Sequence, residues 1–259
     1  MDLQLKDKVA IVGGASQGIG YGIARTLAGE GAKLVITARR ESDLAGAAER
    51  IRGETGAEVL HVHADSRRAE DCATTIERAI TVFGGFDVIV NNDGAPPVGE
   101  LDSFDDAAWQ KAVEQNLMYV VRMSRGALPQ LKMRGGGAIV NIAAISALQP
   151  IPTFGLSVAT WGAVIGFAKT LSLEAAPFGI RVNTICPGYI ETGRLEKVFA
   201  SGGNDPDVMR AKLKSEVPLE RIGTVDDIAS LVALLASPRG SYITGATIQV
   251  DGGLLRAVH

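Results

Sequence analysis

Residues 8–20 read KVAIVGGASQGIG, and this stretch decides the fold. Residues 8–13 form a short apolar run typical of a buried strand, and a helical pattern begins at Gly18. Gly14 permits a tight turn, Gly18 lets the backbone approach a bound diphosphate, and Gly20 lets the helix pack close to the strand. This order of elements predicts a dinucleotide site at the helix N-terminus. The other turn residues predicted to contact the dinucleotide are Ser16, Gln17 and Ile19.

The same alternation of apolar runs and helical patterns continues along the whole chain. Strands are predicted at residues 8–13, 33–37, 58–63, 86–91, 138–142, 180–186 and 246–250. Helices are predicted at residues 18–29, 41–52, 69–82 and 154–176, with a long helix or a helix pair at 104–133. Apolar strands that alternate with helices indicate an α/β protein with a single-domain Rossmann fold over residues 1–259. We expect a doubly wound, mostly parallel seven-stranded sheet with helices on both faces.

An irregular segment at about residues 191–220 follows the sixth predicted strand. Ser201, Gly202, Gly203 and Asn204 stand in its middle. Ligands of doubly wound sheets bind beyond the carboxyl ends of the strands, where this segment begins. Its position therefore predicts a substrate lid.

Composition and charge disfavour several classes of function. The 259 residues carry 26 basic and 29 acidic side chains without a basic block, so no nucleic-acid partner is expected. We find no apolar run of membrane-span length and no signal peptide, and expect no membrane partner. Cys72 and Cys186 are the only cysteines, which favours free thiols in a cytoplasmic protein. His61 and His63 have no third ligand in view, so no metal site is predicted.

The end of the second predicted strand distinguishes between nicotinamide cofactors. An acidic residue there would bind the ribose 2′-hydroxyl of NAD(H), but Ala38 occupies the position and Arg39 and Arg40 follow it. A guanidinium group suits a 2′-phosphate, which favours NADP(H) over NAD(H). The alternative, that both arginines are solvated residues at a helix start, stays open.

With these features the sequence resembles the short-chain dehydrogenase/reductase family over nearly its whole length. The glycine-rich turn resembles the family's Thr-Gly-x-x-x-Gly-x-Gly motif, with Gly13 where threonine is usual. Residues 221–223 and 242–253 resemble a C-terminal signature of 3-oxoacyl-[acyl-carrier-protein] reductases. The resemblance implies cofactor contacts at Asp65, Ser66, Asn92, Gly94, Pro187, Gly188, Ile190 and Thr192, and a catalytic asparagine at Asn116. It also implies a homodimer or homotetramer formed through the two long helices.

The catalytic motif departs from the family pattern. The family uses a serine after the fifth strand and then Tyr-x-x-x-Lys on the next helix, where one helix face carries both side chains. Here Ala144 stands at the serine position, Ser157 at the tyrosine position and Trp161 at the lysine position. No tyrosine in the chain is followed four residues later by lysine. The sequence therefore resembles a divergent 3-oxoacyl-reductase-like branch in which only Asn116 of the tetrad remains.

These substitutions leave the source of a proton open. Ser157, Ser146, Thr160 and Tyr189 are the candidate donors, although a serine hydroxyl is a far weaker acid than an activated phenol. Ser157 has a binding role or merely fills space, and Tyr189 is better explained by packing under the lid. Trp161 either fills the ribose subsite or packs into the core or a subunit interface. Asp93 brings a negative charge close to the expected path of the cofactor.

Three functions are consistent with the sequence. The first is an oxidoreductase with altered proton transfer, acting on a small-molecule carbonyl, alcohol or acyl substrate. The second is a catalytically silent cofactor-binding or scaffold homologue. The third is a non-redox enzyme that reuses the pocket, which the lack of a histidine or cysteine near the site disfavours. Family membership alone does not choose among them.

Overall fold

The computed structural model describes residues 1–94, 96–201 and 205–257. Seven parallel strands form one sheet in the order β3-β2-β1-β4-β5-β6-β7. The strands are β1 (Val9–Val12), β2 (Lys33–Ala38), β3 (Val59–His63), β4 (Val88–Asn91), β5 (Gly137–Ile142), β6 (Ile180–Pro187) and β7 (Thr247–Val250). The predicted single-domain, doubly wound Rossmann fold is confirmed, with every strand pair parallel.

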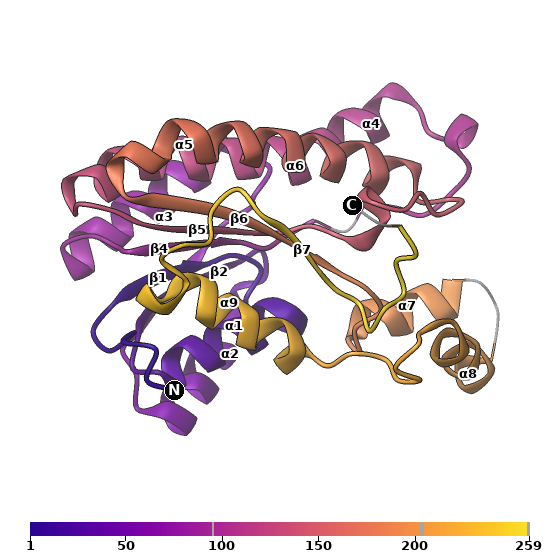
Figure 1. Ribbon diagram of the computed structural model, residues 1–259, viewed down its shortest axis with the longest axis horizontal. Coiled ribbons are helices and arrows are strands. Elements are labelled where there is room, and N and C mark those ends of the chain that lie inside the picture. The colour runs from indigo at the N-terminus through magenta and orange to yellow at the C-terminus, as the bar shows by residue number, and fades with distance from the viewer. Residues whose placement is uncertain (95, 202–204, 258–259) are drawn as a thin grey trace.

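Helices cover both faces of the sheet, as Figure 1 shows. One layer contains α1 (Gly18–Gly29), α2 (Glu41–Thr55) and α9 (Val225–Ala236). The other contains α3 (Ala69–Phe83), α4 (Asp106–Ala112), the π-helical segment η2 (Val113–Met118), α5 (Tyr119–Met133) and α6 (Gly155–Ala175). The segment predicted as a lid contributes α7 (Gly193–Ser201) and α8 (Pro206–Glu216), and short 3-10 turns occupy Leu101–Ser103, Ile145–Ala147, Ala176–Phe178 and Pro238–Gly240.

Each face of the sheet has its own hydrophobic core. Alternate residues of a strand point to opposite faces, so Val12 and Val90 meet α1 and α9 while Ile11 and Ile89 meet α3, α5 and α6. These four side chains are at most 1% exposed. Two apolar faces on a fully parallel sheet explain why the strands are apolar throughout rather than alternating with polar residues. Because both faces are buried, the apolar side chains also fix the register of neighbouring strands.

Two helical regions differ from the sequence prediction. The helix α9 was not predicted, although Thr224 and Asp227 form a capping box at its start. The segment 191–220, predicted to be irregular, forms α7 and α8, and α8 begins with Asp205 as a side-chain cap and proline at the first helical position. The glycine-containing middle of the predicted lid, residues 202–204, lies outside the described residues.

The helix over Gly155–Phe178 corrects another expectation. By length and composition it is apolar enough to cross a membrane, although no such stretch was predicted. In the fold it packs along the sheet next to α5 and β6, and Leu156, Val164 and Ala168 on one side are buried. This is the arrangement of the core helix of a Rossmann fold. The length and composition of one such helix are only weak evidence for a membrane span.

Candidate functional site

The glycine-rich turn lies between β1 and α1, at the carboxyl end of β1. The neighbouring strand there is β4, and the strand order of the sheet reverses between the two. Gly14 and Gly18 have φ angles of 57° and 60°, which side chains other than glycine rarely adopt. A Cβ atom at Gly20 would lie 2.8 Å from the Gly13 carbonyl oxygen and closer still to that of Gly14. The backbone therefore requires glycine at all three positions.

Asn92, the first residue after β4, is hydrogen-bonded to this turn. Its side-chain Nδ2 donates a hydrogen bond of 3.0 Å to the Gly13 carbonyl oxygen, and its own carbonyl oxygen would lie 2.6 Å from a Cβ atom at Gly14. Gln17 is the N-cap of α1 and makes no side-chain capping bond. The first-turn N–H groups of α1 therefore have no side-chain acceptor, which suits an anion at this helix end.

The two arginines after β2 have different surroundings. Arg40 forms an ion pair of 2.5 Å with Asp43, one turn into α2. The Arg39 guanidinium makes no ion pair or hydrogen bond to any described residue, and the Arg39 carbonyl oxygen lies 3.0 Å from Nε2 of His63. Ala38 lines the pocket beside them. Of the two predicted phosphate ligands, only Arg39 has a guanidinium without a partner among the described residues.

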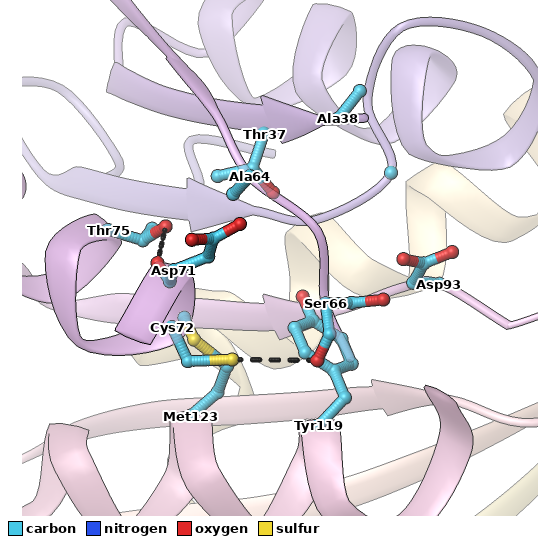
Figure 2. Close-up of a pocket in the computed structure, with 11 residues that line it drawn as sticks. Thr37, Ala38, Ala64, Ser66, Asp71, Cys72, Thr75, Asp93, Tyr119 and Met123 are labelled. Atoms are coloured by element: carbon cyan, nitrogen blue, oxygen red, sulfur yellow. Dashed lines mark hydrogen bonds between the residues drawn. The ribbon is translucent and has the colours of Figure 1, made fainter. Parts of the chain in front are cut away.

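A pocket beside the glycine-rich turn is lined by Gly14 and by Ser66, two of the predicted cofactor contacts (Figure 2). Ser66 lines it with a buried hydroxyl that has no hydrogen-bond partner among the described residues. Asp65 is already engaged, because the Arg67 side chain donates to both of its carboxylate oxygens at 2.9 and 2.5 Å. These bonds lower the pKa of Asp65 to about 2. Ser66 therefore offers the free polar group, and Asp65 holds Arg67.

Tyr119 borders the same pocket and was not singled out in the sequence. Its phenol is fully buried, and a Cβ atom at Gly13 would overlap the Tyr119 hydroxyl oxygen and lie 3.1 Å from Cζ. Burial, with a smaller contribution from the Asp93 carboxylate, raises the pKa of Tyr119 well above its usual value. The phenol thus occupies the room that a side chain at position 13 would need, which explains glycine where the family usually has threonine.

The loop after β6 closes over the turn from the opposite side. Pro187 ends β6, and the Gly188 N–H donates to the Val250 carbonyl oxygen at 3.0 Å. Ile190 is 6% exposed and points into the core. Thr192 faces the glycine-rich turn, since its Cγ2 would lie 3.6 Å from a Cβ atom at Gly18. The structure therefore brings Thr192 of this loop next to the glycine-rich turn.

Asn116 lies in the π-helical segment between α4 and α5, an irregularity that often marks functional sites. Its Nδ2 donates a 2.7 Å hydrogen bond to Thr160 Oγ1, and Thr160 in turn donates 2.7 Å to the Leu156 carbonyl oxygen. Asn116 Oδ1 is buried and has no partner among the described residues. Thr160 is thus committed to holding Asn116, which makes it a poor proton donor.

Ser157, at the start of α6, faces the turn after β5. Its hydroxyl oxygen lies 3.1 Å from that of Ser146, and both side chains are buried. Neither hydroxyl contacts a charged group among the described residues. Ala144, half-buried just after β5, carries only a methyl group and comes two residues before Ser146. The Ser146–Ser157 contact therefore brings the turn that contains Ala144 together with the start of α6.

Trp161 follows Ser157 by one helical turn and is 3% exposed. Its Cζ2 would lie 3.0 Å from a Cβ atom at Gly94, and the same Cβ atom would overlap Asn116 Oδ1. The indole is part of the core formed with α5, and its edge reaches the backbone of the β4 loop. The structure thus shows Trp161 packed in the core with one edge at Gly94, whereas the role of this side chain at a ribose subsite stays a prediction.

Comparison with known proteins assigns the family. A family model described as enoyl-(acyl carrier protein) reductase matches residues 14–255. Human dehydrogenase/reductase SDR family member 4 is 32% identical over 250 residues, which cover 96% of this chain and 88% of that protein. The chain belongs to the short-chain dehydrogenase/reductase family. The resemblance found in the sequence is thereby confirmed at the level of family.

Solved structures of family members agree with this assignment. L-sorbose reductase from Gluconobacter frateurii, in complex with NADPH and L-sorbose, is 34% identical, with both chains covered completely and a TM-score of 0.95. A 7α-hydroxysteroid dehydrogenase in complex with NADH and 7-oxo-glycochenodeoxycholic acid is 27% identical. Its TM-score is 0.92, and the match covers 100% of this chain and 98% of that one. The chain thus shares its complete fold with oxidoreductases of this family.

Tyr189 is the sequence-predicted donor that the structure places elsewhere. Its hydroxyl donates a 3.0 Å hydrogen bond to Glu216 of α8, and its ring packs on the lid cluster of Phe199, Leu213 and Ile222. Burial, and then the Glu216 carboxylate, raise the pKa of Tyr189 to about 12. The phenol is therefore held between the loop after β6 and α8, an arrangement that favours the packing interpretation over a role as proton donor.

Arg194 is a further residue that the sequence did not bring out. It stands at the start of α7, and its Nη2 donates a 2.9 Å hydrogen bond to the Pro96 carbonyl oxygen in the β4 loop. Burial lowers the pKa of Arg194. An arginine close after the family's Pro-Gly loop was the available signal, but only the tertiary contact shows that it bridges the two loops around the site.

Proposed function

We propose that this protein is an NADP(H)-dependent oxidoreductase that interconverts a carbonyl and an alcohol on a small-molecule or acyl substrate. The observation that carries the proposal is the glycine-rich turn, where the Gly20 backbone, the Asn92 side chain and the free N-terminus of α1 form a cradle without room for side chains. Such a cradle fits the diphosphate of a dinucleotide. When bound, the nicotinamide supplies or accepts the hydride.

The cofactor contacts follow from the positions of the predicted residues. The turn would hold the diphosphate, Ser66 and Asp65 would border the adenine, and Arg39 would bind a 2′-phosphate. The full proposed set is Gly14, Ser16, Gln17, Gly18, Ile19, Gly20, Arg39, Asp65, Ser66, Asn92, Gly94, Pro187, Gly188, Ile190 and Thr192. Arg40 is left out, because Asp43 already neutralises it.

The preference for NADP(H) rests on the unpaired Arg39 guanidinium. We expect Arg39→Gln to weaken NADPH binding about 10-fold or more and to leave NADH binding unchanged, because only NADPH carries the 2′-phosphate. The matched control is Arg40→Gln, whose partner is Asp43 and which should change neither affinity by more than about 2-fold. Calorimetric titration measures both. Equal affinity of the unmodified protein for NADPH and NADH would contradict the cofactor assignment, and failure to bind either would remove the oxidoreductase proposal.

Proton transfer takes an altered route in this proposal. The family's Tyr-x-x-x-Lys pair is replaced by Ser157 and Trp161, and the hydrogen-bonded hydroxyls of Ser157 and Ser146 would orient the substrate oxygen. Neither hydroxyl is acidic enough to replace a general acid, whose loss costs about 10²–10⁴ in rate. We expect the combined change Ala144→Ser, Ser157→Tyr and Trp161→Lys to raise NADPH-dependent reduction of a 3-oxoacyl substrate. A folded, cofactor-binding triple variant without higher activity would show that the pocket differs more deeply.

The burial of Trp161 supports a second candidate function. An indole that fills the space between α6 and Gly94 leaves less room for the nicotinamide ribose, and this favours a homologue that binds the nucleotide without redox turnover. The two functions differ in one measurement. The first requires NADPH oxidation above background with some member of a carbonyl panel, whereas the second predicts calorimetric binding of NADPH and no oxidation.

Two further features complete the proposal. The helices α7 and α8 would form the lid over the substrate, held by the contact of Arg194 with Pro96 and by the Tyr189–Glu216 bond. Leu173 and Phe178 lie exposed along and just beyond α6, at 69% and 46% of their surface, and would pack against a second copy in a homodimer or homotetramer. Sedimentation equilibrium measures the number of subunits.

A further inference from the structure

The two described arginines of the lid helices have opposite surroundings. Arg210 on α8 is surrounded by acids: it lies 3.0 Å from Glu191 and 3.6 Å from Asp207, and it also pairs with Glu196. Of the other acids in the segment, Asp205 caps α8 and Glu216 accepts a hydrogen bond from Tyr189. The three acids around Arg210 are therefore paired with that residue and not with Arg194.

Arg194 has no such partner. No carboxylate of the described residues lies within 4.0 Å of its guanidinium, whose one described bond goes to the neutral Pro96 carbonyl oxygen. The group keeps its charge at any physiological pH and has five N–H donors, so most of them remain available. The residue is exposed, so these donors can be reached from solvent. An anion that enters the site would satisfy both its charge and its donors.

The position of Arg194 connects it to the reaction site. It follows Thr192, which faces the glycine-rich turn, by two residues. Its partner Pro96 follows Gly94, which packs against Asn116 and Trp161, also by two residues. Through its bond to Pro96, the guanidinium thus connects the loop that follows β6 to the loop that follows β4, both at the carboxyl ends of their strands.

We infer that Arg194 is the recognition residue for a carboxylate or phosphate group carried by the substrate. Planar guanidinium and carboxylate groups match in a two-bond arrangement, which gives direction as well as attraction. The inference rests on the proposed function, because it assigns the substrate class of the same site. It restricts the carbonyl or alcohol substrate to an anionic molecule whose charged end lies at the lid and whose reacting carbon lies deeper.

The test compares acids with their neutral esters. The probes are 3-oxo acids of four to eight carbons and their methyl esters, added to the full-length protein with saturating NADP⁺ for ligand-detected NMR titration and with NADPH for turnover. The unmodified protein should bind the best acid about 10- to 100-fold more tightly than its ester, as expected for a charge-assisted pair. Arg194→Gln should abolish that ratio by weakening acid binding alone, and Arg194→Lys should keep part of it. Arg78→Gln, an exposed arginine on α3, is the control and should keep all of it.

The outcomes separate the subsite from the proposed reaction. Equal binding of acids and esters by the unmodified protein, no binding of any probe, or an unchanged ratio in Arg194→Gln would overturn the subsite. If Arg194→Gln instead weakens NADPH binding and leaves the acid-to-ester ratio unchanged, the guanidinium serves the cofactor diphosphate and the inference is wrong. Discrimination between acid and ester without any NADPH oxidation would support the subsite and contradict the oxidoreductase function.

Discussion

Replacing Gly20 by alanine tests the glycine-rich cradle directly. A Cβ atom at this position would lie 2.6 Å from Asn92 Nδ2 and 2.8 Å from the Gly13 carbonyl oxygen, and nearer still to that of Gly14. The two carbonyl groups belong to the backbone, and the Asn92 amide is held by its bond to Gly13. The Asn92 amide can rotate away only by giving up that bond, and the two carbonyl groups cannot rotate away at all, so the turn itself has to shift.

The size of the effect follows from these distances. Ordinary van der Waals contact begins at 3.4 Å, so the Gly13 carbonyl must retreat by more than half an ångström and the Gly14 carbonyl by more. Overpacking of this kind costs about 1–3 kcal/mol of folding free energy. The same shift displaces the N–H groups at the start of α1 from the diphosphate, and we expect NADPH binding to weaken by about 10–100-fold, which is about 1.4–2.8 kcal/mol.

Gly29→Ala, at the other end of α1, is the matched control. No atom lies within 4 Å of a Cβ atom there, and alanine in place of a helical glycine gains up to about 1 kcal/mol. Urea unfolding followed by circular dichroism at one fixed protein concentration gives the stabilities, and calorimetric titration gives the NADPH affinities. If Gly20→Ala unfolds at the parent's urea midpoint and binds NADPH as the parent does, the turn is not the close-packed cofactor seat described above.

Three other outcomes are expected. Because Arg67 holds the pKa of Asp65 at about 2, below an unfolded value of about 3.9, the pair stabilises the fold fully above about pH 5. That contribution is lost as the pH falls toward 2. The Arg67→Gln variant should therefore lose less stability between about pH 5 and pH 2, as measured by urea unfolding. An unaltered pH profile would show that the Asp65–Arg67 pair does not cause this loss. Burial raises the pKa of Cys72 to about 11 and of Cys186 to about 12. Iodoacetamide at pH 8 should therefore label neither thiol in the native protein and both after denaturation, as followed by mass spectrometry. Rapid labelling of the native protein would contradict the burial of the two thiols. Asp227→Ala removes the capping box of α9 and the partner of Arg221, and should lower the free energy of unfolding in urea by about 1 kcal/mol. Replacing the exposed neighbour Asp226 by alanine should lower it less. Equal losses of stability in the two variants would refute the capping role of Asp227.

The sequence was sufficient for the fold because its signals are local. Continuous apolar runs at residues such as Val88–Asn91 specify buried parallel strands, and the glycine-rich turn specifies where the first crossover begins. The regularity of 191–220 was missed because a glycine cluster in its middle hid two short amphipathic helices. The signals for α8 and α9 were nevertheless present, in the Asp205-Pro206 pair and in the Thr224–Asp227 spacing.

The site was predictable where backbone geometry determines the residue and not where side-chain partners do. Gly14, Gly18 and Gly20 follow from φ angles and close approach, which a motif encodes. That Arg40 pairs with Asp43, and that Tyr189 turns to Glu216 on α8, depends on rotamers and on contacts between distant segments. No spacing rule in the sequence reports such partners, so the candidate donors and phosphate ligands had to be narrowed by the structure.

The contact between Gly13 and Tyr119 also constrains how this chain can change by mutation. These residues are far apart in the sequence, yet each occupies the space that the other position would need. Substitution toward a family consensus usually stabilises a protein, but threonine at position 13 would meet the buried phenol and the Asn92 carbonyl oxygen, 2.9 Å from the new Cβ atom. The two sites are therefore epistatic. Threonine at position 13 requires both a smaller side chain at 119 and a shift of the Asn92 backbone, so the change at 13 alone would give a destabilised protein.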